Sequence, residues 1–182
     1  RRGDLDRARE AFDQAARELE RTVPPDSMSA ARVHNDRAYL AYVQGRLDDA
    51  ASLIALSEAE VDKLGSTGNI ERLNLLSTRS KIDRQQGKLD ASLATARQRV
   101  ALASSIYSPE DRTAILARND VGNTLIVLER HAEAAEELDA AATLASKHPD
   151  LAEQVLYQHT RAAVARKGLG RRDRARETLT TS

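Results

Sequence analysis

The sequence predicts an all-α fold, an α-solenoid of antiparallel helix pairs, on three observations. A similar turn recurs along the chain: the turns that open at Gly3, Gly45, Gly87, Glu129 and Gly170 are separated by 42, 42, 42 and 41 residues. A repeat of this length is typical of solenoid proteins. Ala, Arg and Leu are the most frequent residues, and all three favour helix. No segment alternates between apolar and polar residues for long enough to indicate a strand.

Each turn combines a helix-ending residue with an apolar helical face that follows it. Glycine readily adopts the left-handed conformation that ends a helix. A small residue follows five positions later, and two more residues on the same helical face come four and then three positions further on. The small residues are Ala8, Ala50, Ser92, Ala134 and Ala175, the second set is Phe12, Ile54, Ala96, Leu138 and Leu179, and the third is Ala15, Ser57, Arg99, Ala141 and Ser182. The face is weakest at Arg99.

The predicted helices can be placed between these turns. A first helix spans residues 4–22, and helix pairs follow at 27–44 with 47–64, 70–86 with 89–107, and 110–128 with 132–147. A further helix spans residues 151–167, and a truncated one begins at about residue 172. Ser27, Asn69 and Ser108 are the predicted N-caps, because serine and asparagine side chains accept hydrogen bonds from the first free amides of a helix.

The repeat resembles that of the tetratricopeptide-repeat (TPR) family. Residues 118–145 carry its motif best, with Val121-Gly122, Leu125, Ala134, Leu138 and Ala141 in the family's order and spacing. The common repeat has 34 residues, whereas the longer unit here resembles the repeats of kinesin light chains and many bacterial regulators. Arg37 and Arg79 depart from the motif, because the family usually has a large apolar residue at their positions.

The resemblance implies a right-handed superhelix formed by residues 1–182 as a single repeat array. The array contains the second helix of one repeat, three full repeats and one further partial repeat. Each repeat in a solenoid needs a neighbour to cover its apolar face. Because neither end has an obvious polar cap and the chain begins at Arg1, we expect it to be a fragment of a longer protein, or its open ends to self-associate.

Composition and charge disfavour several classes of function. The chain carries 28 basic and 28 acidic residues, so its formal net charge is zero. Proteins that bind nucleic acid directly or bind a membrane surface usually carry an excess of basic charge. No apolar run approaches the roughly 18 residues of a membrane span. The absence of cysteine excludes disulfides and thiolate metal sites, and is typical of a reducing compartment, so we expect a cytoplasmic location.

No motif predicts an enzyme, a metal site or a cofactor site. The four histidines, His34, His131, His148 and His159, do not form an HExxH pair or another metal-ligand spacing. The serines lack a GxSxG context, and no phosphate-binding GxxxxGK[ST] loop is present. The sequence therefore predicts a protein without catalytic residues, metal or cofactor.

In TPR proteins the first helix of each pair lines a concave groove that binds extended peptides. The resemblance therefore implies groove positions for thirteen polar or aromatic residues: Arg32, Asn35, Tyr39, Tyr42, Asn74, Ser77, Lys81, Arg84, Asn119, Asn123, Tyr157, Thr160 and Arg161. Equivalent positions hold Asn35, Ser77, Asn119 and Thr160, which we interpret as a polar ladder. An asparagine amide both donates and accepts hydrogen bonds, so it can hold a peptide backbone. The cations could attract a carboxylate or phosphate, whereas the alternative is that these polar residues are helix caps or are only solvated.

Two functions follow from these observations. The first is a non-enzymatic scaffold that binds a protein or an extended peptide in its concave groove. The alternative is a peptide- or ligand-sensing segment of a larger bacterial transcription regulator or protein kinase. The Arg- and Ala-rich, Lys-poor composition is typical of a high-GC bacterium. An adjoining DNA-binding or kinase domain would favour the second.

Overall fold

The computed structural model describes residues 7, 10–15, 17, 18, 21, 26–148, 151, 157, 160–168 and 170. Within this part of the chain the regular secondary structure is entirely helical. The chain divides into two compact units, residues 1–88 and residues 89–182.

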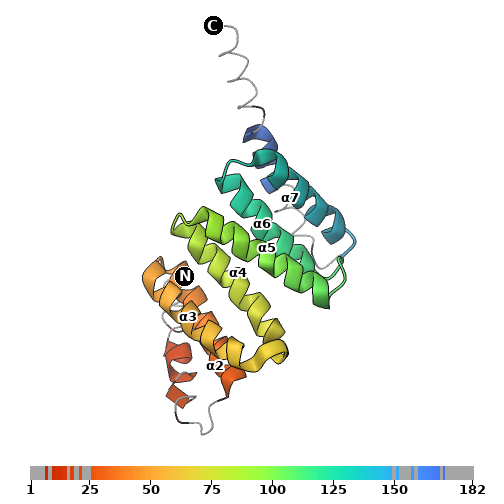
Figure 1. Ribbon diagram of the computed structural model, residues 1–182. Coiled ribbons are helices and arrows are strands. Elements are labelled where there is room, and N and C mark those ends of the chain that lie inside the picture. The colour runs from red at the N-terminus through yellow and green to blue at the C-terminus, as the bar shows by residue number, and fades with distance from the viewer. Residues whose placement is uncertain are drawn as a thin grey trace. The chain divides into compact units, whose positions relative to one another are not determined.

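The first unit contains one antiparallel helix pair and the first helix of the next pair. Helix α2 spans Ser27–Val43, α3 spans Leu47–Leu64, and a 3₁₀ turn, η1, at Gly65–Gly68 leads into α4, which spans Asn69–Gln85. Helix α4 packs against both α2 and α3 (Figure 1). One core cluster of this unit is made of small and medium apolar side chains: Ala38, Ala41, Ala50, Ile54 and Ile82. Small residues allow the helix backbones to approach each other closely.

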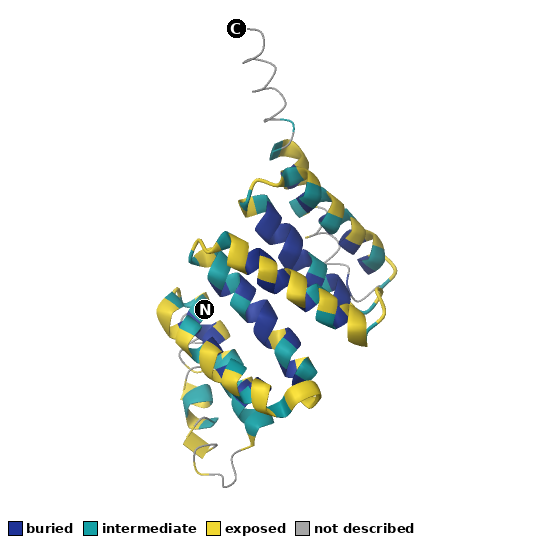
Figure 2. Cartoon of the chain, in the orientation of Figure 1, coloured by how far each residue is buried: buried dark blue, intermediate teal, exposed yellow. Residues whose placement is uncertain are grey.

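The second unit is built around α6. Helix α5 spans Leu89–Ile106, α6 spans Arg112–Val127 and α7 spans His131–Ala145. Helix α6 packs against both α5 and α7, and ten of its 16 residues are buried (Figure 2). Ala165, in the helical stretch 160–168, joins the same core as Val121 and Leu125. A pair of helices and their neighbours therefore form a packed group in each unit.

The predicted helix boundaries are confirmed to within two residues for α2 to α7. Helical residues at 10–15 and 160–168 agree with the predicted helices at 4–22 and 151–167. The truncated helix predicted from residue 172 lies outside the described residues.

Three of the predicted turns have the same backbone structure. The amide that follows each corner donates to a carbonyl five residues earlier: Arg46 to Ala41 at 2.9 Å, Lys88 to Asp83 at 2.8 Å and Arg130 to Leu125 at 2.9 Å. The corner residues Gly45, Gly87 and Glu129 have left-handed φ angles of 77°, 77° and 56°. This hydrogen-bond pattern ends a helix by satisfying its last carbonyl groups. The repeat inferred from the sequence is therefore confirmed at three successive corners.

The predicted turn at Gly170 is wrong, and Gly3 lies outside the described residues. Gly170 has helical geometry, and space is open where its side chain would be. Glycine permits a left-handed conformation without requiring it, so glycine spacing alone did not determine this corner.

The three predicted N-caps are also wrong. The cap of α2 is Asp26, which accepts from the Met28 amide at 3.1 Å, and Ser27 is the first helical residue. The cap of α6 is Asp111, which accepts from the Thr113 amide at 2.7 Å, three residues after Ser108. Helix α4 continues directly from the 3₁₀ turn, with Gly68 in place of Asn69 at the cap position and no side-chain cap. Aspartate and serine are equally suited to capping, so residue preference could not separate adjacent candidates.

The predicted small and apolar positions after the corners at Gly45, Gly87 and Glu129 are buried. After Gly3, Phe12 and Ala15 are only half-buried. Ala8, Ala175, Leu179 and Ser182 lie outside the described residues. Ala50, Ser92 and Ala134 are each 0% exposed, and Ile54, Ala96, Leu138, Ser57 and Ala141 are also in the core. Arg99, the exception in the pattern, is 6% exposed, and its Nη1 atom lies 2.6 Å from Oδ2 of Asp120 on α6. A buried charge is tolerated when an opposite charge neutralises it, so this position keeps the helical face despite its residue type.

Close packing of α6 on α7 depends on Gly122. A Cβ atom at this position would lie 2.5 Å from Cγ of Leu138, closer than packed carbon atoms can approach. The Val121-Gly122 pair of the TPR-like motif therefore has a physical role, because it lets Leu138 fill the space above the α6 backbone.

Candidate functional site

In the first unit, three of the predicted groove residues line one hollow between α2 and α4. This hollow has a volume of about 170 Å³ and is lined by Ala31, Arg32, Asn35, Asp36, Glu71 and Asn74. Arg32 and Asn74 are exposed and Asn35 is half-buried. The first helices of successive pairs thus lie close enough here to contribute to the same surface.

An ion pair joins the two helices at this hollow. Both Nε and Nη2 of Arg32 approach Oε1 of Glu71, at 2.8 Å and 2.6 Å. The Glu71 side chain is only 4% exposed, whereas the Arg32 side chain is 60% exposed. Arg32 therefore neutralises a buried carboxylate, a role that competes with binding an anionic ligand.

A second group of predicted residues lies further along the same two helices. The Tyr39 and Tyr42 rings have centroids 5.9 Å apart. The Lys81 ammonium lies 5.7 Å from the Tyr39 ring centroid and donates to the Ser77 hydroxyl at 2.9 Å. Tyr39 remains 47% exposed, so this group offers an aromatic surface beside a cation. Arg84 is half-buried.

In the second unit, Asn123 brings three predicted residues together. Its Oδ1 atom accepts from Nε of Arg161 at 2.9 Å and from the Tyr157 hydroxyl at 3.4 Å. Tyr157 is 49% exposed and Thr160 is also exposed. The contact spans α6 and the helical stretch 160–168, which is the same relation between first helices that α2 and α4 show in the first unit.

Two equivalent asparagines share an unusual feature. The side-chain oxygens of Asn35 and Asn119 are both buried, and neither has a hydrogen-bond partner among the residues that the structure describes. Among the described residues, the Asn35 amide nitrogen makes only a long contact, 3.5 Å, to Oδ1 of Asp36. An unsatisfied buried acceptor costs about 1–3 kcal/mol, so two of them at one position of the repeat require an explanation.

The polar ladder is not uniformly accessible. Ser77 is 9% exposed and Asn119 is 6% exposed, whereas Asn35 is half-buried and Thr160 is exposed. Sequence reasoning missed Asp36 and Glu71 as lining residues of the first hollow. Asp36 is the next residue after Asn35 on the same turn of α2, so it could have been predicted as a neighbour of this site. Nothing in the sequence indicates that Glu71 lies there.

Within the described ranges, no group of three or more His, Asp or Glu side chains could hold a metal ion. His34, His131 and His148 are half-buried, and His159 lies outside those ranges. None of the helices in this part of the chain combines the length and apolar character that crossing a membrane requires.

In the part of the chain that the structure describes, the regular secondary structure is helical and the helix pairs have a repeat-like arrangement. No protein-family model matches the sequence, and no curated protein matches it either.

Proposed function

We propose that the chain is a non-enzymatic scaffold that binds an extended peptide in the concave groove of a right-handed TPR-like solenoid. The repeated corners, the resemblance of residues 118–145 to the TPR motif and the contacts between first helices support this proposal. A cytoplasmic location belongs to the same proposal and agrees with the absence of cysteine.

The unpartnered oxygens of Asn35 and Asn119 are the observation that carries the proposal. An extended peptide presents a row of backbone N–H donors, and an asparagine oxygen can accept one of them. Binding would then relieve the cost of leaving these acceptors unsatisfied. Both oxygens are buried, so each amide must rotate toward the face to meet a peptide.

Exposed side chains beside the asparagines supply the remaining contacts of a peptide site. Tyr39 in the first unit and Tyr157 in the second are about half exposed, at 47% and 49%. Aromatic rings provide large contact areas at a low cost in conformational entropy. In this proposal the asparagines hold the peptide backbone and the tyrosines contact its side chains.

The test compares peptide binding with folding stability in the same variants. A random peptide pool is bound to the full chain, and the affinity of the tightest peptide is then measured with the Asn35→Ala, Asn119→Ala double variant. We expect binding to weaken by about 10- to 30-fold, because each neutral hydrogen bond contributes about 1 kcal/mol and about 1.4 kcal/mol corresponds to tenfold in Kd. The melting temperature should not fall, because the replaced oxygens have no partners among the described residues.

Asn69→Ala is the matched control, since Asn69 is the first residue of α4, directly after the cap position at Gly68. The control should keep the affinity of the parent chain. Unchanged affinity in the double variant would overturn the role of the asparagines, and the absence of any bound peptide would overturn the scaffold proposal itself.

A further inference from the structure

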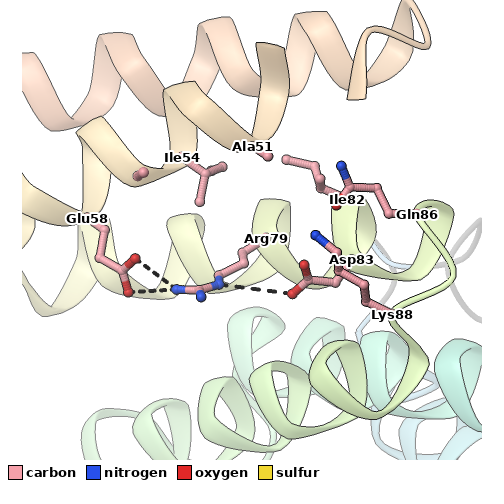
Figure 3. A pocket seen from close by; sticks show the side chains of 9 residues that line it. Ala51, Ile54, Glu58, Arg79, Ile82, Asp83, Gln86 and Lys88 are labelled. Atoms are coloured by element: carbon pink, nitrogen blue, oxygen red, sulfur yellow. Dashed lines mark hydrogen bonds and ion pairs between the residues drawn. The ribbon is translucent and has the colours of Figure 1, made fainter. Parts of the chain in front are cut away.

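A separate cavity lies in the first unit between α3 and α4. It has a volume of about 160 Å³, far above the roughly 15 Å³ that holds one ordered water. Its lining combines an apolar part with charged and polar groups: Ala51, Ile54, Ala55, Glu58, Arg79, Ile82, Asp83, Gln86 and Lys88 (Figure 3). None of these residues belongs to the proposed peptide-binding face, so this cavity is independent of that proposal.

The two carboxylates that line the cavity, those of Glu58 and Asp83, differ in how closely Arg79 approaches them. Arg79 donates from Nη1 to both carboxylate oxygens of Glu58, at 2.7 Å and 2.8 Å. The same guanidinium reaches Asp83 only through Nε, at 4.0 Å. Figure 3 shows Arg79 lying between the two carboxylates. Glu58 is therefore neutralised, whereas Asp83 is paired weakly.

Asp83 is a carboxylate in a poorly solvated position. Its side chain is 15% exposed, and burial raises the pKa of Asp83 although Arg79 and Lys88 act in the opposite direction. Nearby, the Gln86 side-chain oxygen is buried and accepts no hydrogen bond within the described part of the chain. The polar end of the cavity thus offers two acceptors that lack a strong donor.

The opposite part of the cavity is apolar. Ile54 and Ile82 are buried core residues whose side chains line it, together with Ala51 and Ala55. Methylene groups placed against this surface would be removed from water, which is favourable. The cavity therefore combines a surface for a short aliphatic chain with acceptors for a cationic head group.

We propose that this cavity binds a primary ammonium group on an unbranched aliphatic chain, with the ammonium held by Asp83 and Gln86. The aliphatic chain lies along Ile54 and Ile82. Both a free alkylamine and a lysine side chain of a partner protein have this chemistry. Lys88, an exposed cation at the rim, competes for the same carboxylate.

The experiment titrates the full chain with n-butylammonium chloride and follows backbone amide shifts by NMR. We expect saturable shifts in residues 51–58 and 79–88, and only weak shifts with n-butanol or sodium butyrate at the same concentrations. Asp83→Asn should weaken butylammonium binding by about tenfold, since a hydrogen bond to a charged group contributes more than a neutral one. Lys88→Met should strengthen binding several-fold, because it removes the competing cation.

Asp49→Asn is the control for lost negative charge, because Asp49 is exposed and pairs with Arg46 outside the cavity. Its affinity for butylammonium should equal that of the parent. Nα-acetyl-lysine methylamide separates the two sources: tighter binding than butylammonium assigns a lysine side chain, and weaker binding assigns a free amine. Equal shifts with n-butanol, unchanged affinity in Asp83→Asn, or weaker binding in Lys88→Met would each overturn the proposal.

Discussion

At the scale of single residues, the Arg99–Asp120 ion pair is buried on both sides. The two side chains are 7% and 8% exposed and 2.6 Å apart. The low-dielectric surroundings strengthen their attraction, but each charge alone would be expensive to bury. The pair fixes α5 against α6 at a position where the other repeats use Ser57 or Ala141.

Removing one partner of this pair should be far more damaging than removing both. We expect Arg99→Met or Asp120→Leu to lower the free energy of unfolding by about 3–5 kcal/mol, and the double variant to recover most of that loss. Urea unfolding of the four proteins measures this. A cost below about 1 kcal/mol for each single variant, the value of an exposed ion pair, would show that the charges are solvated.

Asp83 should make stability depend on pH in the opposite direction from a paired carboxylate. Burial raises the pKa of Asp83 in the folded chain above its ordinary value of 3.8. The folded state then binds more protons than the unfolded state between these two pKa values, so this residue lowers stability as pH rises through that range. Asp83→Asn should therefore raise the melting temperature at pH 7 and leave it unchanged near pH 3. A lower melting temperature at pH 7 would contradict this sign.

At the scale of elements, the three similar corners predict how residue type affects stability. Glu129 holds a left-handed φ of 56°, where Gly45 and Gly87 hold 77°. A residue with a Cβ pays about 1–2 kcal/mol in this conformation. Glu129→Gly should therefore stabilise the chain by about 1 kcal/mol, and Gly87→Ala should destabilise it by a similar amount. Thermal unfolding of both variants checks the prediction, which fails if the two substitutions shift stability in the same direction.

The α6–α7 contact predicts a packing effect at Gly122. The added methyl group of Gly122→Ala would collide with Leu138, and overpacking of this kind costs about 1–3 kcal/mol. Adding Leu138→Ala should make the double variant less unstable than the sum of the two single variants. Gly170→Ala is the control, because Gly170 is helical with open space around the added atom, and it should be neutral or stabilising. Strict additivity at Gly122 and Leu138 would mean that the helices separate to admit the methyl group.

Most helix boundaries and corners could be predicted from the sequence, because the same turn pattern recurs in several repeats. The corners at Gly45, Gly87 and Glu129 were found from their spacing, even where glutamate replaces glycine. The N-cap residues could not be predicted in this way, because they do not recur from repeat to repeat and because the neighbouring residues Asp26 and Ser27 both suit an N-cap. Side-chain contacts between helices could not be predicted from the sequence either: no residue near Arg99 in the chain indicates that Asp120 is its partner.

The candidate site was predictable to the same extent. The resemblance assigned Asn35, Asn74, Asn123 and Arg161 to the groove-lining first helices, and within each unit two of them do lie close together: Asn35 with Asn74, and Asn123 with Arg161. The exposed fraction of each side chain could not be predicted from its position in the repeat. Asn119 has the same repeat position as Asn35 but is only 6% exposed, because exposure depends on which side chains pack around each helix.

At the scale of the whole molecule, we propose that the first helices of the pairs bind peptide and that the second helices support them. The most direct measurement is the set of backbone amide shifts in the full chain upon binding the tightest peptide from the pool. We expect the largest shifts in α2, α4, α6 and residues 160–168. Shifts confined to α3, α5 and α7, with the first helices unchanged, would contradict it.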